Sequence, residues 1–388
     1  MEPLKILLVL HTPWTPDLGL PRCSIELAGE FRERGHVVDR FDLCDAFPRR
    51  TRLGAFFEHA LFPRRAVAFV RRHGHEYDVV QAEQGNLPVS KHALGYDGVL
   101  VCRSDGLVHF YVEWLREHGR KRKPARGSLP GAALRSLATR LDGGVGAVER
   151  SFAFADAIVL LNHDELRFVT DRLGHGDKAL VLPNGLSEDC FAALAAAAGS
   201  PERRHAAQHV VLVGHLSERK GLSDLPTLVR RIRELLPHAR VSFLGAGLPA
   251  KHVLPLFAPQ DRDRLRVVES FAPDELPSLL CDATVGILPS YLEGFPLGAL
   301  EQLAAGVPTV AYDAPGSREL LRSLPSALTP LGDPDALAAE VARVLSLPQP
   351  AYAALAEQAR EVAGRFRWAE IADQTLAAYE EAGARRDR

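Results

Sequence analysis

Two glutamates with the spacing of a ligand site, Glu293 and Glu301, stand eight positions apart across a Gly-Phe-Pro turn. The apolar run 283–289 that precedes them has the length and composition of a buried strand. After Leu297, leucine and alanine recur at helical spacing. A strand, a glycine turn and a helix in this order aim the free N–H groups and the positive dipole end of the helix at an anion such as a phosphate.

The positions of the two carboxylates predict which chemical groups flank the phosphate in the ligand. Glu293 precedes the helix and can reach past a bound phosphate, whereas Glu301 lies about 12 Å of helical rise further along and can reach back along one side. A molecule with hydroxyl groups at both ends and phosphates between them fits this spacing, which is the chemistry of a nucleotide sugar. Two glutamates on a solvated helix face are the alternative, and the surrounding residues decide between the two interpretations.

A second loop suited to phosphate lies at 214–221, between an apolar run that predicts a strand and a run that predicts a helix. Arg219 and Lys220 are adjacent cations in this loop and suit a diphosphate, although a solvated turn is the alternative. Both this loop and the loop at Glu293 open at the carboxyl end of an expected strand, where parallel sheets bind ligands. Gly245 also ends an expected strand and predicts a tight turn near the nucleotide.

Composition limits the classes of protein to consider. A chain of 388 residues with 46% apolar and 25% charged residues is typical of a globular protein with two domains, and its net charge of −2 argues against a nucleic-acid partner. Five cysteines without metal-ligand spacing indicate reduced thiols. Because no signal-peptide pattern and no apolar run of membrane-spanning length occurs, we expect a cytoplasmic protein. A basic run at 116–126 is either a solvated loop or a peripheral contact with the inner membrane face.

The two halves of the chain share one layout of alternating strands and helices. An apolar run at 5–10 and another at 210–214 each precede residues with helical spacing and then a further apolar run. Each half therefore predicts a Rossmann-like unit with a parallel sheet, so the expected fold class is α/β with two such sheets facing across a cleft. We expect the connection within 187–208, an N-terminal acceptor domain over 1–190 and a C-terminal donor domain over 205–368.

The segment from Glu293 to Val310 resembles the donor site of retaining glycosyltransferases of family 4, which belong to the glycosyl transferases group 1 and have the GT-B fold. There the pattern is Glu, seven residues, Glu, and then a helix that ends in Gly-x-Pro before another strand; here Gly306 and Pro308 complete it. The resemblance is strong from Pro183 onward and loose before that. It implies that a C-terminal helix at about 370–388 packs back on the first domain and that no bound metal or cofactor is needed.

The resemblance also implies roles for individual residues. Glu293 would bind hydroxyl groups of the donor sugar and Glu301 the ribose, while Lys220 and Arg219 would neutralise the leaving diphosphate. Besides Glu301, the implied donor-binding residues are Gly19, His215, Gly245, Phe271, Gly294, Phe295, Pro296, Leu297 and Gly298.

Three positions depart from the family pattern. His215 stands where arginine is usual in the phosphate loop, and Gly19 is the one glycine of a loop in which many members have two. Asp105 stands where the family has a histidine before glycine. Its carboxylate can accept a hydrogen bond from a sugar hydroxyl or an acceptor amine, or it can be an ordinary turn residue.

The sequence thus predicts a retaining, metal-independent hexosyltransferase that moves a sugar from a nucleoside diphosphate sugar to an acceptor hydroxyl in the interdomain cleft. The acceptor can be a small molecule, a lipid or a glycan. Two alternatives stay open, a nucleotide-sugar epimerase on the same scaffold and a non-catalytic protein that kept the fold. An oxidoreductase is disfavoured because no Gly-x-Gly-x-x-Gly follows the first strand.

Overall fold

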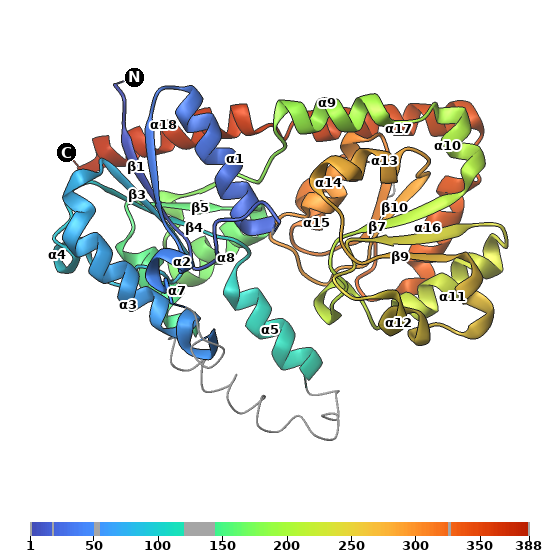
Figure 1. Ribbon diagram of the computed structural model, residues 1–388, viewed down its shortest axis with the longest axis horizontal. Coiled ribbons are helices and arrows are strands. Elements are labelled where there is room, and N and C mark those ends of the chain that lie inside the picture. The colour runs from blue at the N-terminus through green and yellow to red at the C-terminus, as the bar shows by residue number, and fades with distance from the viewer. Residues whose placement is uncertain (1, 18, 50–54, 120–143, 325–326, 387–388) are drawn as a thin grey trace. The chain divides into compact units, whose positions relative to one another are not determined.

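The computed structural model describes residues 2–17, 19–49, 55–119, 144–324 and 327–386 (Figure 1). The chain forms two compact units, of which unit 1 comprises Met1–Pro183 with Trp368–Arg388 and unit 2 comprises Asn184–Arg367. Each unit contains a six-stranded sheet in which every neighbouring pair of strands is parallel. The expected α/β class with two Rossmann-like units is therefore confirmed.

The sheet of unit 1 has the order β2-β1-β3-β4-β5-β6. Its strands are β1 (Lys5–Val9), β2 (Val37–Phe41), β3 (Val79–Glu83), β4 (Val99–Arg103), β5 (Ala157–Leu160) and β6 (Ala179–Val181). All residues of β3, β4 and β5 are buried, as expected for strands that are covered by helices on both faces.

The helices of unit 1 follow these strands along the chain. They are α1 (Gly19–Glu33), α2 (Leu43–Ala46), α3 (Ala55–His73), α4 (Lys91–Leu94), α5 (Val108–Gly119), α7 (Gly144–Phe154), α8 (His163–Leu173) and α18 (Trp368–Arg386). The last of these returns the C-terminal segment to unit 1. Tyr379 donates a hydrogen bond to Gln81 at 2.7 Å and packs its ring 5.9 Å from that of Phe31, so α18 lies against α1 and the sheet.

The sheet of unit 2 has the order β12-β11-β10-β7-β8-β9. Its strands are β7 (His209–Val213), β8 (Arg240–Leu244), β9 (Leu265–Val268), β10 (Val285–Leu288), β11 (Thr309–Tyr312) and β12 (Leu328–Thr329). The helices are α9 (Glu188–Ala197), α10 (Pro201–Ala207), α11 (Leu225–Leu235), α12 (Ala250–Val253), α13 (Leu276–Leu280), α14 (Leu297–Ala304), α15 (Ser317–Leu321), α16 (Pro334–Leu345) and α17 (Gln349–Gly364). Helix α11 packs against α16 and α14 packs against α17.

The division between the units falls between Pro183 and Asn184, so the segment 187–208, in which we expected the connection, belongs to unit 2. This segment forms α9 and α10. The side chains of Ser187 and Ser200 cap the two helices by accepting hydrogen bonds from the third backbone amide along the chain. An alanine-rich run with such caps favours helix over linker, because alanine loses the least conformational freedom in a helix.

A buried arginine holds the end of α14. Arg204 on α10 has no exposed surface and donates hydrogen bonds to the carbonyls of Ala283, Ala305 and Gly306 at 2.9, 2.9 and 2.6 Å. Two of these carbonyls follow the last turn of α14 and have no partner within that helix. The guanidinium therefore satisfies them and ties α14 to α10 and to the segment before β10.

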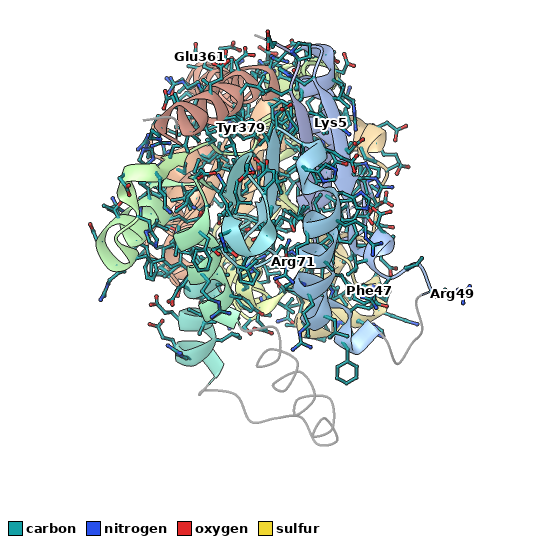
Figure 2. The ribbon with its side chains drawn as sticks, turned by 90° about the vertical axis from the view of Figure 1, so that its left-hand side faces the viewer. Lys5, Phe47, Arg49, Arg71, Glu361 and Tyr379 are labelled. Atoms are coloured by element: carbon teal, nitrogen blue, oxygen red, sulfur yellow. The ribbon has the colours of Figure 1, made fainter. Side chains whose placement is uncertain are left out.

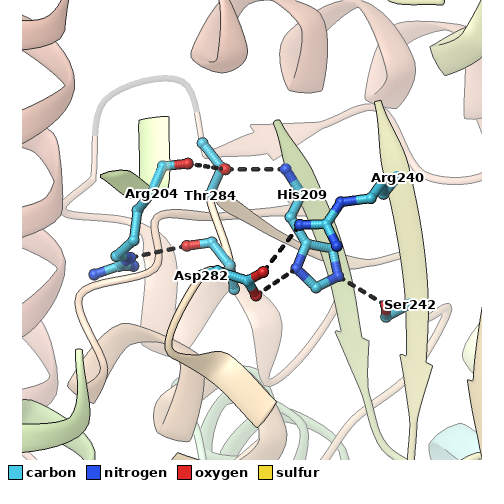
Figure 3. Close-up of polar contacts among 7 residues, drawn as sticks. Arg204, His209, Arg240, Ser242, Asp282 and Thr284 are labelled. Carbon is cyan, nitrogen blue, oxygen red and sulfur yellow. Dashed lines mark hydrogen bonds and ion pairs between the residues drawn. The ribbon is translucent and has the colours of Figure 1, made fainter. Parts of the chain in front are cut away.

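Figure 3 shows a second buried polar network at the amino end of the same sheet. His209 hydrogen-bonds Asp282 through Nδ1 at 2.9 Å and Ser242 through Nε2 at 2.7 Å. The residue types are those of a hydrolytic triad, but Ser242 and His209 are each 3% exposed, so no substrate can reach the hydroxyl. The network therefore has a structural role, and burial lowers the pKa of His209 against the opposing effect of Asp282.

Replacing Arg204 by alanine should lower the free energy of unfolding by about 3–5 kcal/mol, because three buried carbonyls lose their donor. Chemical denaturation of the variant measures this loss. The exposed neighbour Arg203 is the matched control, and its replacement by alanine should change stability by less than about 0.5 kcal/mol. Equal effects of the two substitutions would contradict a structural role for the buried guanidinium.

The lowered pKa of His209 makes the stability of the protein depend on pH. The unfolded histidine binds a proton below its ordinary pKa of 6.5, whereas the folded one resists it, so the free energy of unfolding should fall as the pH drops below about 6.5. His209→Gln removes this titration and should flatten that part of the pH profile. The free energy of unfolding is compared between the parent and His209→Gln from about pH 7 to about pH 5, the range in which an unperturbed histidine titrates. Equal slopes for the two proteins in that range would rule out the burial effect.

Candidate functional site

Most predicted site residues of unit 2 lie in loops that follow neighbouring strands, whereas Leu297, Gly298 and Glu301 lie on α14. Segments 214–221, 245–249, 269–275 and 289–296 follow β7, β8, β9 and β10, respectively. Because β10, β7, β8 and β9 are consecutive and parallel in the sheet, their carboxyl ends meet at one edge. Residues up to about 80 positions apart in the sequence, such as 214 and 294, are thus brought to one side of the unit.

The centre of this edge is the carboxylate of Glu293, which is 6% exposed. Its Oε2 lies 3.1 Å from Nη1 of Arg219, and its Oε1 lies 3.1 Å from Nζ of Lys220. The hydroxyl of Ser290 donates a hydrogen bond to Oε1 at 2.8 Å. Burial favours the protonated acid, but the charges of Lys220 and Arg219 and the bond from Ser290 hold the pKa of Glu293 below its usual value. Glu293 is therefore ionised at neutral pH.

Glycine allows the two loops to approach this closely. Gly221 has a positive φ of 77°, and a Cβ atom there would collide with the carbonyl of Pro289. The loop after β7 thus lies backbone against backbone on the end of β10. The backbone carbonyl of Arg219 also accepts a hydrogen bond from the Tyr291 amide at 2.9 Å. This bond fixes the register of the two loops and hence the positions of Arg219 and Lys220.

The first turn of α14 lies against the end of β7. A Cβ atom at Gly298 would collide with the carbonyl of Val213, so a side chain at that position would push the helix away from the sheet. The cap residue Pro296 makes no side-chain hydrogen bond to the helix, and the Leu297 amide donates to the Phe295 carbonyl at 3.1 Å. The positive end of the α14 dipole therefore lies at the same edge as Glu293 and its two cations.

Glu301 lies one turn further along α14 and is 5% exposed. A glutamate on a solvated helix face, the alternative for this position, would be exposed, so that alternative is wrong for Glu301. Phe295 and Pro296 are likewise buried and pack the turn, and the ring of Phe295 lies 5.0 Å from that of Phe366. Their contribution is thus to hold the turn between β10 and α14.

Two rings lie over the loop that follows β8. A Cβ atom at Gly245 would lie 2.9 Å from the ring of Phe271, and one at Gly247 would lie 3.2 Å from the ring of His215. Phe271 is half-buried and His215 is exposed. Residues predicted separately from three loops are therefore brought together beside β8, at the same edge as the Glu293 cluster.

The structure also assigns positions that the sequence analysis missed. The Glu293 amide donates to the Pro315 carbonyl at 3.2 Å, and a Cβ atom at Gly316 would lie 2.5 Å from the Glu293 carbonyl. The loop after β11 thus supports the backbone of the Glu293 turn. A Pro-Gly pair that begins three residues after an apolar run is the signal in the sequence that marks this position.

Asp224 fixes the same turn from the other side. Its Oδ2 accepts hydrogen bonds from the hydroxyls of Tyr291 and Tyr312 at 2.8 and 2.9 Å. These bonds join the start of α11 to the ends of β10 and β11. Tyr291 directly precedes Leu292 and Glu293, so Asp224 helps to hold the site without belonging to the loops that carry it.

Gly19 and Asp105 belong to unit 1, where each also follows a strand. Gly19 is the first residue of α1, and Asp105 follows β4 and accepts a hydrogen bond from the side chain of Gln84. Loss of surrounding water raises the pKa of Asp105, an effect that the neighbouring Glu83 increases and His11 opposes. Oε2 of Glu83 in turn lies 2.7 Å from Nδ1 of His11. Asp105, Glu83 and His11 therefore form a polar cluster at the carboxyl edge of the unit 1 sheet.

Within the described ranges, no group of three or more histidine, cysteine, aspartate or glutamate side chains is arranged to hold a metal ion. No helix among those residues is long and apolar enough to cross a bilayer. Of the predicted basic run 116–126, residues 120–126 lie outside the described residues.

Residues 207–347 match the model of the family described as glycosyl transferases group 1. D-inositol 3-phosphate glycosyltransferase from Geodermatophilus obscurus is 31% identical over 60% of this chain and 54% of its own length. Putative colanic acid biosynthesis glycosyltransferase WcaL from Escherichia coli is 29% identical over 39% of each chain. The chain spans about half the length, or less, of the curated relatives that it matches.

Solved structures show the same fold over nearly the whole chain. Sucrose-phosphate synthase from Thermosynechococcus elongatus has a TM-score of 0.73 at 18% identity and covers 98% of this chain and 99% of its own. HepE from Anabaena in complex with UDP and glucose has a TM-score of 0.66 at 18% identity and covers 97% of this chain and 100% of its own. The catalytic domain of starch synthase IV from Arabidopsis thaliana bound to ADP and acarbose has a TM-score of 0.69 at 13% identity. It covers 98% of this chain and 99% of its own. The fold is therefore GT-B.

The Glu293 cluster should contribute to the stability of unit 2. Glu293→Gln removes the charge between Arg219 and Lys220 and should lower the free energy of unfolding by about 2 kcal/mol, because two partly buried cations lose their partner. Denaturant unfolding measures this change. Glu269→Gln, at an exposed position of the loop after β9, is the control and should have almost no effect. If Glu293→Gln had the same free energy of unfolding as the parent, the proposed contribution of the ion cluster to stability would be wrong.

Proposed function

We propose that this chain, whose residues 207–347 belong to the glycosyl transferases group 1, transfers a sugar from a nucleoside diphosphate sugar to an acceptor hydroxyl. The observation that carries this proposal is the buried Glu293 carboxylate held between Arg219 and Lys220, beside the start of α14. This group combines an acceptor for sugar hydroxyls with two cations and a helix dipole for a diphosphate.

The donor would occupy the carboxyl edge of the unit 2 sheet. Its diphosphate would lie at the start of α14 and share Arg219 and Lys220 with Glu293, while Glu293 accepts hydrogen bonds from the sugar. Glu301 would bind the ribose, and the base would lie toward Phe271 and the Gly245 turn. Two proteins of the same fold hold UDP and ADP in their solved structures, which supports a nucleotide as the ligand.

The proposed reaction retains the configuration at the anomeric carbon and forms no covalent enzyme intermediate. The bond between the anomeric carbon and the phosphate oxygen breaks, and the acceptor oxygen bonds that carbon from the same face. The departing phosphate takes the proton of the acceptor hydroxyl. Arg219, Lys220 and the α14 dipole would stabilise the negative charge that grows on the diphosphate, which supports a reaction without a metal ion.

The acceptor would bind at the carboxyl edge of the unit 1 sheet, near Gly19 and Asp105. The carboxyl of Asp105 can hydrogen-bond an acceptor hydroxyl, and its raised pKa keeps the neutral, donating form accessible closer to neutral pH. Under this proposal the two edges meet across a cleft when both substrates are bound, and closure excludes water that would otherwise hydrolyse the donor.

Incubation with UDP-, GDP- and dTDP-sugars tests the activity. The intact protein should release free nucleoside diphosphate slowly without an acceptor and faster with one, and NMR of the product should show the anomeric configuration of the donor. Glu293→Gln should reduce turnover at least about 100-fold, whereas Glu361→Gln, at an exposed position of α17, should leave it unchanged. Turnover of Glu293→Gln within a few-fold of the parent would contradict the role of this carboxylate.

Nucleotide binding separates the second glutamate from the first. Glu301→Gln should weaken UDP or GDP affinity about tenfold by loss of a charged hydrogen bond to the ribose, with a smaller effect on turnover at saturating donor. A thermal-shift titration measures the affinity, because a bound nucleotide stabilises the folded chain. Interconversion of the donor sugar without release of nucleotide would instead identify an epimerase, and no nucleotide binding at all would identify a non-catalytic protein.

A further inference from the structure

The outer face of α3 carries an unusual set of exposed side chains. Figure 2 shows this face of unit 1, with Arg71 on the helix and Phe47 beside it. The inner face of α3 packs Phe62, Ala66 and Val70 into the core of unit 1. The exposed positions recur at helical spacing and form a stripe that runs about 22 Å along the helix. The stripe consists of Phe57, Leu61, Arg64, Arg65, Ala68, Arg71 and Arg72.

The stripe is positively charged along most of its length. The one acidic residue of α3, Glu58, is 3% exposed and so contributes no carboxylate to the outer surface. Among the described residues, Arg64, Arg65, Arg71 and Arg72 form no ion pair. Arg71 donates to the Ala93 carbonyl at 2.9 Å, and Arg65 lies 5.9 Å above the ring of Phe47, so neither of these contacts supplies a counter-charge. Four charges without counter-charges favour an anionic partner.

The apolar end of the stripe determines which anionic partner fits. Phe57 and Leu61 are 42% and 39% exposed and lie one helical turn apart, ahead of the arginines. Exposure of two large apolar side chains costs free energy in water, and that cost is relieved where the partner has an apolar layer beneath its charges. A phospholipid surface has this layering, whereas a nucleic-acid backbone does not. The net charge of −2 also argues against general attraction to polyanions.

We propose that the outer stripe of α3 docks unit 1 on an anionic phospholipid surface. The arginines contact the headgroup phosphates, and Phe57 and Leu61 enter the boundary between headgroups and acyl chains. Arginine suits the first contact because its planar guanidinium donates two hydrogen bonds to one phosphate. This surface differs from the basic run 116–126 and does not depend on the proposed transferase activity.

Sedimentation with vesicles tests the proposal on the full chain. The protein should sediment with vesicles of phosphatidylglycerol and phosphatidylcholine, less so at high salt, and remain in solution with phosphatidylcholine alone. Reversing two exposed charges with Arg64→Glu and Arg72→Glu should weaken binding at least about 25-fold, at about fivefold for each arginine. Arg203→Glu with Arg230→Glu, at exposed helix positions of unit 2, gives the same change in net charge and should leave binding unchanged.

A second variant separates lipid from other polyanions. Phe57→Ser with Leu61→Ser should weaken vesicle binding several-fold and leave retention on heparin unchanged; both positions are exposed, so the circular dichroism spectrum should stay that of the parent. The proposal is overturned if the parent does not bind anionic vesicles, or if the control pair weakens binding as much as the α3 pair. It is also overturned if the serine variant binds vesicles as well as the parent, because the stripe would then be a general polyanion site of the kind that nucleic acid occupies.

Discussion

The ion cluster around Glu293 is the interaction on which the arrangement of the unit 2 edge depends. A carboxylate that is 6% exposed must be neutralised by nearby cations, and Arg219 and Lys220 come from a loop more than 70 positions earlier in the chain. The cluster therefore joins the loop after β7 to the turn after β10. Because a nucleotide would need the same cations, the residues that hold the site together are those that would meet the ligand.

Close backbone approach is the second constraint. Gly221 lies on the end of β10, Gly298 on the end of β7, and Gly316 on the backbone of the Glu293 turn. In each case a Cβ atom would occupy the place of a carbonyl group. These three contacts bring strand ends and a helix start nearer than side chains would permit, and they leave the first turn of α14 beside the cations.

Helix α14 is held at both of its ends by interactions of different kinds. At its start the turn is packed by Phe295 and Pro296, and at its end Arg204 binds the carbonyls of Ala305 and Gly306. A short helix of eight residues would fray without such contacts. Its dipole and Glu301 can therefore act on a ligand only because α10 and the sheet fix the helix in place.

The amino-acid sequence by itself determined the α/β class, the two parallel sheets and the strand, turn and helix around Glu293. These depend on local patterns, namely apolar runs, glycine turns and helical spacing, which a single segment carries. The adjacency of Arg219 and Lys220 was visible too, but not that both would pair with Glu293.

Only the tertiary structure decided which distant residues meet. The contacts of Asp224 and Gly316 with the Glu293 turn or its neighbours depend on strand order, which no local pattern encodes. The same holds for 187–208, where alanine content and serine caps favour helix, and the packing of α9 and α10 assigns them to unit 2. Exposure of the α3 stripe was likewise decided by the fold, because the core accepts one face of that helix and leaves the arginines in water.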